Sequence, residues 1–528
     1  MLLQDLVLKT ASRTPDQTAL IERDDRISYA QLAAQVREFA DFLLESGLQP
    51  GERVGVYLNK QIASVVSFFG TALAGCVIVP INSRLKTVQV AHILNDCGVR
   101  VLVSSSALVD GLGTTWHAGP ELAAVISIDG PPANPASQLN WFDWGSLPAA
   151  TASEVQPHIV DADIAAIFYT SGSTGLPKGV VLSHRNIVAG AHSVAEYLEN
   201  GAEDIVLAVL PLSFDAGFSQ LTTMFSTGGT VVLMDYLLPQ DVIRAVAEYA
   251  VTGLAGVPTL WNQLAGLEWP AEAAASLRYY TNTGGSMPGA TLAALREKLP
   301  KASPYLMYGL TEAFRSTYLP PAEIDRRPTS IGIPIPNADI AVVRHDGTLC
   351  EPNEHGELVH RGALVAQGYW NNAEATAERF KPWPFSAAER QVPELAVWSG
   401  DTVYRDADGF LYFVARFDEM IKSSGFRISP TEVEACVHQS SHVEQCAAFG
   451  VPHEDLGQAV VVVYLPNADG DGRSEDILAL CRRDLPGYMV PRQVIAAAAM
   501  PTTSSGKIDR RALRDAYASL FVAEAAPC

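Results

Sequence analysis

Cysteine is scarce in this 528-residue sequence, and the motifs that usually employ it are missing. The seven cysteines are scattered and odd in number, and no two of them have the Cys-x-x-Cys spacing. A disulfide framework or a structural zinc site is therefore not expected, and the reduced thiols of a cytoplasmic protein are the simplest interpretation. The 11 histidines include no His-Glu-x-x-His motif of zinc hydrolases.

Positive charge is also in short supply. Lysine and arginine number 37 against 58 aspartates and glutamates, which gives a formal net charge of −21. An acidic surface repels nucleic acids and anionic lipids, so no nucleic-acid partner is expected. The total charge does not exclude a local cationic site for a small anion.

Signals for export or membrane insertion are missing as well. The first residues, MLLQDLVLKT, lack a basic region followed by an apolar core, so they do not form a signal peptide. The stretch Gln61–Ser83 carries no charge and approaches the length of a membrane span. Two glycines, Pro80 and a group of β-branched residues favour a buried helix followed by a buried strand, and we expect no membrane insertion.

Short apolar runs alternate with amphipathic stretches through most of the chain, which is too long for one ordinary core. Helical patterns such as 29–46 and 239–249 accompany these runs, so the predicted fold class is α/β, with βαβ units and mostly parallel sheets. The predicted buried strands are 53–58, 76–81, 99–105, 165–172, 205–211 and 229–234.

The sequence pattern changes after about residue 330. Short, alternating segments separated by glycines at 338–344, 356–362 and 409–417 predict a small β-barrel-like piece. Beyond residue 418 a pattern of helices and strands resumes. We therefore expect an N-terminal domain of residues 1–417 and a small, mobile α+β C-terminal domain of residues 418–528.

The sharpest local motif is Tyr169-Thr-Ser-Gly-Ser-Thr-Gly-Leu-Pro-Lys-Gly179, directly after an apolar run. Its glycines let the backbone approach a polyanion, while its hydroxyls and Lys178 supply donors and positive charge, so the motif indicates phosphate binding. It is neither a Walker A loop nor a Gly-x-Ser-x-Gly hydrolase elbow. The alternative of a flexible surface linker fits poorly between two apolar segments.

This loop resembles the signature of the adenylate-forming superfamily, which comprises acyl-CoA synthetases, amino-acid adenylation domains and luciferase-like ligases. The resemblance covers essentially the whole chain, and its details are most similar to stand-alone AMP-forming acyl-CoA ligases of exosortase gene clusters. Further motifs follow in the order of the superfamily: Tyr308-Gly-Leu-Thr-Glu312, Gly356-Glu-Leu, Gly368-Tyr-Trp370, Trp398-Ser-Gly-Asp401, Arg416-Phe-Asp418, Leu485-Pro-Gly and Gly506-Lys507. Gly356-Glu-Leu and Gly368-Tyr-Trp370 resemble the motif that builds the small barrel, and we interpret it as structural.

The resemblance implies an ATP site with bound Mg²⁺. It gives Lys507 the role of the adenylation lysine, places Thr311 on the α-phosphate and lets Glu312 hold the metal. Tyr308 would stack on adenine and Asp401 would bind the ribose hydroxyls. The implied nucleotide-binding residues are Thr170, Ser171, Gly172, Ser173, Thr174, Lys178, Gly284, Gly285, Ser286, Tyr308, Gly309, Asp401 and Arg416.

The same resemblance implies a second step at the same site. Asp418 would be the hinge about which the C-terminal domain turns, and Lys422 and Gly425 would face the site during thioester formation. The acceptor would be CoA or the phosphopantetheine of a carrier protein in trans, because the chain contains no carrier domain.

The acid substrate is less well defined by sequence. Asp215 falls where amino-acid-activating members bind an ammonium, although it could equally cap the helix that follows. Arg315 could bind a second carboxylate or pair with Asp215. The positions that would line the acyl site are Phe214, Asp215, Ser219, Ala255, Thr281, Thr283, Met307, Arg315 and Ser316.

These observations predict an ATP-dependent, AMP-forming ligase for a small polar or amino-bearing carboxylic acid. One alternative is an acyl-CoA synthetase for a fatty or aryl acid. A non-catalytic nucleotide-binding protein would have damaged motifs at Lys507, Glu312 or Asp401, and all three residues are present. Adenylation without thioester formation would need an altered Lys422–Gly425 loop, which is not seen.

Overall fold

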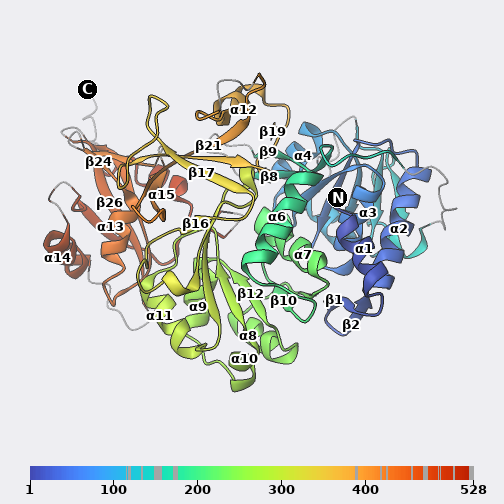
Figure 1. Ribbon diagram of the computed structural model, residues 1–528, viewed down its shortest axis with the longest axis horizontal. Coiled ribbons are helices and arrows are strands. Elements are labelled where there is room, and N and C mark those ends of the chain that lie inside the picture. Colours follow the sequence, from blue (N-terminus) through green and yellow to red (C-terminus); the bar gives the residue numbers. More distant parts are fainter. Residues whose placement is uncertain are drawn as a thin grey trace.

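The described residues of the computed structural model form four β-sheets with helices packed around them (Figure 1). The described ranges are 1–113, 116, 121–132, 135–147, 157–170, 177–386, 391–416, 419–423, 426–453, 456–467, 474–485, 487, 489–503 and 506–521, without the side chains of 422, 426 and 427.

The first large sheet has eight strands and contains most of the strands expected in the N-terminal third of the chain. Its central strands are parallel, with Arg53 opposite Val77 on one neighbour and Val99 on the other. The order across the sheet is β19 (Gly368–Tyr369), β9 (Lys178–Ser183), β8 (Ile164–Thr170), β4 (Val77–Asn82), β3 (Arg53–Leu58), β5 (Val99–Ser104), β6 (Ala124–Ser127) and β7 (Asn140–Asp143).

The second large sheet has nine strands, and its middle strands are also parallel. The strand expected at 205–211 ends at Ala208, because the Val209 N–H donates back to the Leu207 carbonyl at 3.1 Å and turns the chain out of the sheet. The order is β16 (Ile333–Pro334), β15 (Thr317–Leu319), β14 (Ser303–Tyr308), β13 (Tyr279–Asn282), β12 (Gly253–Gly256), β10 (Ile205–Ala208), β11 (Thr230–Leu233), β1 (Thr18–Glu22) and β2 (Asp25–Ser28).

Fifteen α-helices and three short 3₁₀ turns complete the described part of the chain. The helices are α1 (Asp5–Arg13), α2 (Tyr29–Glu45), α3 (Ile62–Leu73), α4 (Thr87–Asp96), α5 (Ser106–Gly111), α6 (His184–Tyr197), α7 (Asp215–Thr227), α8 (Pro239–Glu248), α9 (Pro258–Ala265), α10 (Ala271–Ser276), α11 (Gly289–Lys298), α12 (Ala373–Arg379), α13 (Pro430–Val437), α14 (Ser474–Asp484) and α15 (Arg510–Ala516). The turns are η1 (Trp144–Ser146), η2 (Thr311–Ala313) and η3 (Pro321–Glu323).

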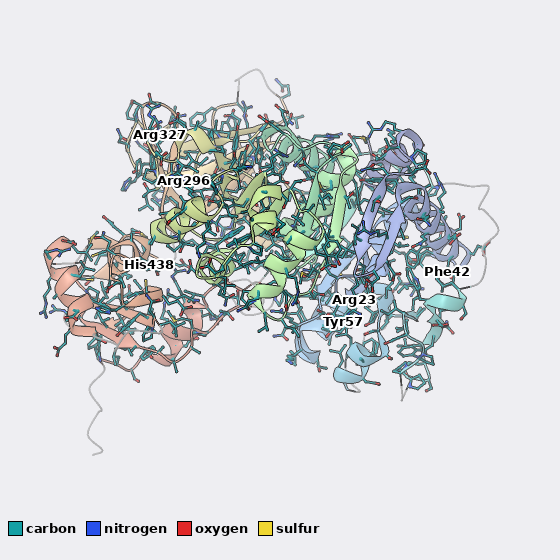
Figure 2. The ribbon with its side chains drawn as sticks, turned by 90° about the horizontal axis from the view of Figure 1, so that it is seen from below. Arg23, Phe42, Tyr57, Arg296, Arg327 and His438 are labelled. Carbon is teal, nitrogen blue, oxygen red and sulfur yellow. The ribbon has the colours of Figure 1, made fainter. Side chains whose placement is uncertain are left out.

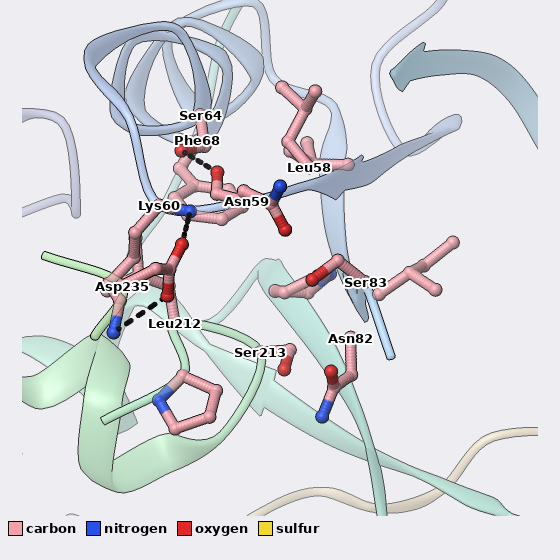
Figure 3. Close-up of a pocket in the computed structure, with 14 residues that line it drawn as sticks. Leu58, Asn59, Lys60, Ser64, Phe68, Asn82, Ser83, Leu212, Ser213 and Asp235 are labelled. Atoms are coloured by element: carbon pink, nitrogen blue, oxygen red, sulfur yellow. Dashed lines mark hydrogen bonds and ion pairs between the residues drawn. The ribbon is translucent and has the colours of Figure 1, made fainter. Parts of the chain in front are cut away.

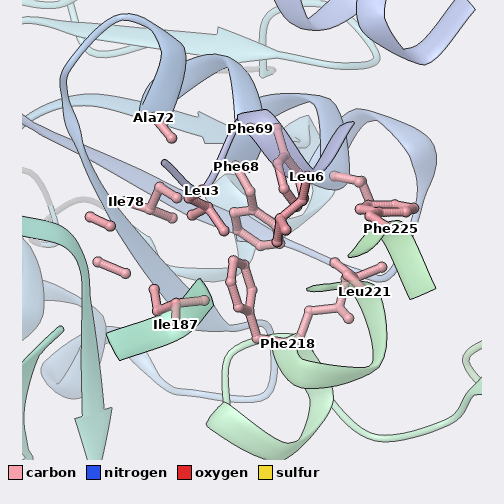
Figure 4. Close-up of a cluster of buried hydrophobic side chains, with 14 of the residues drawn as sticks. Leu3, Leu6, Phe68, Phe69, Ala72, Ile78, Ile187, Phe218, Leu221 and Phe225 are labelled. Atoms are coloured by element: carbon pink, nitrogen blue, oxygen red, sulfur yellow. The ribbon is translucent and has the colours of Figure 1, made fainter. Parts of the chain in front are cut away.

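A single hydrophobic cluster joins elements of the two large sheets (Figure 4). Phe68 on α3 contacts Phe218 on α7 with ring centroids 5.5 Å apart, and Phe69 contacts Phe225 at 5.2 Å. The uncharged stretch 61–83 thus forms the buried helix α3 and the buried strand β4, as predicted. No helix in the described part of the chain has the length and apolar content that a bilayer crossing needs.

The predicted barrel-like piece is an antiparallel sheet of five strands, in which β22 pairs with β21. The motif Gly368-Tyr-Trp370 was assigned to this piece from sequence, and that assignment is wrong. Gly368 and Tyr369 form β19 and pair with β9, which adds a strand to the eight-stranded sheet. The strands of the five-stranded sheet are β17 (Ala338–Val343), β18 (Gly356–Gly362), β21 (Leu395–Arg405), β20 (Phe380–Pro382) and β22 (Leu411–Arg416).

The last sheet draws its strands only from residues 421–496, and α13, α14 and α15 pack against it. Figure 2 shows this part, marked by His438, at one end of the molecule, and Phe42 and Tyr57 at the other. The boundary proposed at 417/418 falls on two residues outside the described ranges and stays a prediction. The strands are β24 (Phe426–Ile428), β23 (Ile421–Ser423), β26 (Gly457–Pro466), β25 (Val443–His453) and β27 (Gln493–Ala496).

Candidate active site

The nine-stranded sheet places the residues predicted to line the acid site, which we call the acid side, at the carboxyl ends of its parallel strands. Strands β10, β12, β13 and β14 are parallel, so the segments after their carboxyl ends converge, which is where open α/β sheets bind ligands. Ala255 pairs with Thr281 on the neighbouring strand, and the Thr283 N–H donates to the Gly256 carbonyl at 3.1 Å. The loop 309–316 follows β14 and leads into β15, which pairs antiparallel with β14.

Asp215 is engaged by two side chains of that loop. The Thr311 hydroxyl donates to its Oδ1 at 3.0 Å, and Arg315 Nη1 donates to its Oδ2 at 2.7 Å. The pair is largely buried, with side-chain exposures of 7% for Arg315 and 15% for Asp215. Of the two alternatives for Asp215, helix capping is not observed, because Phe214 occupies the N-cap of α7 and Asp215 lies in its first turn.

Other acid-side positions are buried and already have polar contacts. The Ser219 hydroxyl lies 3.5 Å from that of Thr223, and Tyr197 donates to the Met307 sulfur at 3.5 Å. Ser316 lies 3.1 Å from His360 Nδ1, and burial lowers the pKa of His360 to about 4. These positions bring small, partly polar side chains to one face of the sheet.

The nucleotide side is organised around Asp401 on β21. Its Oδ2 accepts a hydrogen bond from the Tyr308 hydroxyl, and its Oδ1 lies 3.4 Å from Arg416 Nε. No described residue donates a hydrogen bond to Oδ1, although the side chain is buried. Burial raises the pKa of Asp401, while Arg416 and the Tyr308 hydroxyl oppose that change. The arrangement leaves one buried carboxylate oxygen for a ligand donor.

Strands β8 and β9 flank the phosphate loop, and Tyr369 connects this part of the sheet to Glu312. Thr170 and Lys178 are opposite each other on β8 and β9, and Lys178 Nζ lies 5.7 Å from the centre of the Tyr369 ring. The Tyr369 hydroxyl donates to Glu312 Oε1 at 2.5 Å. Sequence analysis missed this role of Tyr369, since its motif was interpreted as purely structural.

Glu312 offers one carboxylate to a cation. Among the described residues, no group of three or more His, Cys, Asp or Glu side chains could hold a metal by itself. A single carboxylate fits Mg²⁺ nonetheless, because this ion usually keeps waters and takes its other ligands from substrate phosphates.

Lys507 reaches the site from the C-terminal part of the chain. A Cβ atom on Gly284 would lie 3.0 Å from Lys507 Cε, so the lysine stem passes close to the backbone of the Gly284-Gly285-Ser286 loop. Burial of the ammonium lowers its pKa, and Arg416 adds to this effect, although the residue as a whole keeps solvent exposure. The carboxylates of Asp215 and Asp401 act in the opposite direction on this pKa.

Several predicted residues lie outside the described ranges. They are Ser171, Gly172, Ser173 and Thr174 of the phosphate loop, together with Asp418 and Gly425 of the hinge region. Lys422 has a described backbone on β23, where it pairs with Arg427, and no described side chain.

A separate polar cavity lies near the start of α7, and sequence analysis did not find it (Figure 3). Its volume of about 40 Å³ has room for a few water molecules. Lys60 lines it and donates from Nζ to the carbonyls of Val209 and Leu210, at 2.8 and 3.2 Å. None of the predicted site residues lines this cavity.

The chain matches the family model of AMP-binding enzymes over residues 7–370 and that of the AMP-binding enzyme C-terminal domain over residues 432–507. It is 31% identical over 546 residues to a long-chain-fatty-acid–CoA ligase of Salmonella typhimurium, covering 97% of this chain and 94% of that protein. It is 32% identical over 509 residues to a feruloyl-CoA synthase of Amycolatopsis sp, covering 95% and 96%.

The fold is shared with solved structures. ATP-bound MatB from Rhodopseudomonas palustris superimposes with a TM-score of 0.86 at 23% identity, covering 99% of this chain and 100% of that one. The chain therefore belongs to the AMP-binding enzyme family and is an AMP-forming acid–thiol ligase of the adenylate-forming superfamily.

Proposed function

We propose that this ligase activates a small polar or amino-bearing carboxylic acid and transfers the acyl group to a thiol. The observation that carries the proposal is the largely buried Asp215–Arg315 pair, which an acid with a second polar group could contact. The pair is linked to the predicted nucleotide motif through Thr311, which donates a hydrogen bond to Asp215.

The chemistry proceeds in two displacements. An oxygen of the acid carboxylate attacks the α-phosphorus of ATP, the bond to the β-phosphate oxygen breaks, and pyrophosphate leaves. A thiolate then attacks the acyl carbon, and AMP leaves with the electron pair of the broken carbon–oxygen bond. Negative charge builds at the α-phosphate during the first displacement, and we assign its stabilisation to the Lys507 ammonium. The Thr311 hydroxyl would contribute once the nucleotide replaces Asp215 as the acceptor of its hydrogen bond.

Other residues orient the reactants. Asp401 Oδ1 accepts no hydrogen bond from a described residue beside its ion pair with Arg416 and fits a ribose hydroxyl donor, while Lys178 supplies charge for the phosphates. Glu312 would hold Mg²⁺, which would neutralise phosphate charge.

The polar substrate class is supported by the buried Asp215–Arg315 pair. Burying two charges is costly, and an apolar pair of similar volume is often at least as stable, so a long alkyl chain would gain nothing from these groups. The hydroxyls of Ser219 and Thr223 add to the polar character of the same face. An amino-bearing acid would have to share Asp215 with Arg315.

A fatty or aryl acid is the second candidate. It is supported by the names of the two relatives, a long-chain-fatty-acid–CoA ligase and a feruloyl-CoA synthase. Both names specify CoA, which favours CoA over a carrier protein as the thiol acceptor.

The test is ATP–pyrophosphate exchange with a panel of acids of matched chain length. Each length would include the unsubstituted, hydroxy, amino, dicarboxylic and aryl acid, with palmitate added as a long-chain member. We expect the polar short acids to support exchange and Lys507→Ala to lower its rate by about 100- to 1,000-fold. Exchange confined to palmitate or aryl acids would replace the polar assignment by the second candidate. Exchange with no acid of any class would refute the proposed activity.

A further inference from the structure

The loop that carries Thr311 and Glu312 contains a strained backbone turn at Phe314. Phe314 has φ 55° and ψ −43°, and the Arg315 N–H donates to the Ala313 carbonyl at 2.5 Å. These values describe a γ-turn of the rare strained kind, which is unfavourable for a residue with a side chain. Strain of this kind persists only where the surroundings enforce it, and it concentrates at functional sites.

A glycine on α6 supplies part of that enforcement. A Cβ atom on Gly190 would lie 2.4 Å from Cδ1 and 2.8 Å from Cε1 of the Phe314 ring, which is impossible without movement of the ring. The ring fills the space that the missing side chain leaves, and Phe314 is completely buried there. The Phe314 ring therefore packs directly on the backbone of Gly190, in a space that we call the Gly190 notch.

The turn determines where Arg315 points. By reversing the chain within one residue, it directs the Arg315 side chain towards Asp215 on α7. The Phe314 carbonyl accepts a second hydrogen bond from the same Nη1 atom, at 3.1 Å, and the guanidinium carbon lies 5.9 Å from the Phe314 ring. The strained residue and the arginine thus form one unit on the acid side of the site.

We propose that Phe314, locked by the Gly190 notch, is a positioning residue for the acid substrate, which acts by fixing Arg315 against Asp215. The proposal rests on the proposed function, since it needs the acid to bind beside this pair. We expect a larger effect on acid recognition than on nucleotide recognition, because the turn holds Arg315 against Asp215, whereas Tyr308 and Asp401 contact each other.

The experiment is Gly190→Ala, assayed by ATP–pyrophosphate exchange. The added methyl group displaces the ring, and an error of about 1 Å in positioning costs about 100-fold, so kcat/KM for the acid should fall by about that factor. The KM for ATP should stay at the wild-type value. The matched control is Gly111→Ala, another helical glycine, whose added Cβ would meet nothing within 4 Å.

Two further variants separate positioning from general damage. Gly190→Ala combined with Phe314→Leu makes room for the methyl group and should recover most of the lost acid kcat/KM. In an Arg315→Met background, Gly190→Ala should cause no additional loss, because the group through which it acts is already gone. If Gly190→Ala does not fold, Phe314→Leu alone carries the test and should impair acid kcat/KM without changing the KM for ATP.

The outcomes are distinct from those that test the activity itself. If the wild type catalyses exchange and Gly190→Ala keeps the same kcat/KM for the acid, the positioning role is overturned and the proposed function stays intact. An equal rise of the KM for acid and for ATP would also overturn it, as would additive losses from Gly190→Ala and Arg315→Met. Failure of the wild-type protein to activate any acid would overturn both proposals together.

Discussion

The molecule holds two lysines in crowded surroundings, and they differ in what surrounds the ammonium. Lys60 donates to two carbonyls and lies 3.4 Å from Asp235 Oδ1, so each of its donors has a partner within the fold. Lys507 Nζ donates no hydrogen bond to any described residue, although Asp215 and Asp401 influence its pKa. Burial lowers the pKa of both lysines, yet only Lys507 keeps donors for a ligand.

The carboxylates of the two regions differ in the same way. Asp235 accepts from the Lys60 backbone N–H at 2.9 Å and pairs with its ammonium. Asp401 is more deeply buried and still has an oxygen that accepts no hydrogen bond from described residues. Buried polar groups are normally hydrogen-bonded, so the groups left over distinguish a binding site from a structural network.

Removing Lys507 should give the largest effect. Lys507→Ala should lower the exchange rate by about 100- to 1,000-fold, as the loss of one donor to a developing oxyanion does. The melting temperature should not change, because the lysine satisfies no other group. If Lys507→Ala lost stability as well as activity, Lys507 would have a structural role like that of Lys60, and the difference between the two lysines would not hold.

Lys60 should instead affect stability, with a dependence on pH. Its pKa is lowered to about 8 in the folded protein and is about 10.4 when unfolded, so the folded state binds fewer protons between these values. The cost of charging Lys60 in the fold is therefore complete below pH 8 and is relieved as pH rises. The free energy of unfolding of the wild type, relative to Lys60→Met, should increase by about 2 kcal/mol from pH 7.5 to 9.5.

Urea unfolding at several pH values measures this difference. The control is Lys9→Met, since Lys9 is 60% exposed and pairs only with Asp5 on the same helix. If the difference in free energy of unfolding between wild type and Lys60→Met did not change with pH, the pKa of Lys60 would not be lowered by burial, and the prediction would be wrong.

Asp401→Asn should have a smaller effect on the nucleotide side. The amide keeps an acceptor for Tyr308 but loses the charge, and a hydrogen bond to a charged group contributes about 1.5–3 kcal/mol. The KM for ATP should rise by about tenfold or more, while the KM for the acid should stay constant. The matching Asp235→Asn variant should leave both unchanged, and a rise in its KM for ATP would contradict the division between the two regions.

The smallest effect should come from a charge pair that is satisfied at the surface. Arg296 donates two hydrogen bonds to Asp325, at 2.5 and 3.0 Å, and the two side chains are 42% and 74% exposed. Arg296→Ala should change the free energy of unfolding by at most about 0.5 kcal/mol in a urea titration. A larger loss would show that satisfied charges contribute to stability even without burial.

The sequence predicted the parallel core well because buried strands and amphipathic helices have clear periodicity. The expected strand at 53–58 is β3 itself, and the helix at 29–46 differs from α2 by one residue. Gly368 and Tyr369 were misplaced because pairing with β9 is a long-range event that a two-residue strand cannot signal.

The candidate site was predicted in part. The nucleotide residues were predicted from motifs, and their roles stay predictions. The pairing of Arg315 with Asp215 is one of the two alternatives that the sequence left open, because the two residues lie one hundred positions apart in the chain. The Phe314 turn has no sequence signature, since positive φ normally selects glycine or asparagine. The hinge at Asp418 and the roles of Lys422 and Gly425 stay predictions.

The pairing of β19 with β9 also has a consequence for synthesis on the ribosome. Strand β9 ends at Ser183, while its edge partner begins only at Gly368. At 5–20 residues per second, the intervening chain takes roughly 10–40 s to emerge. During that interval the edge that carries Lys178 stays unpaired and open to association with other nascent chains, a hazard that ends when Gly368 and Tyr369 arrive.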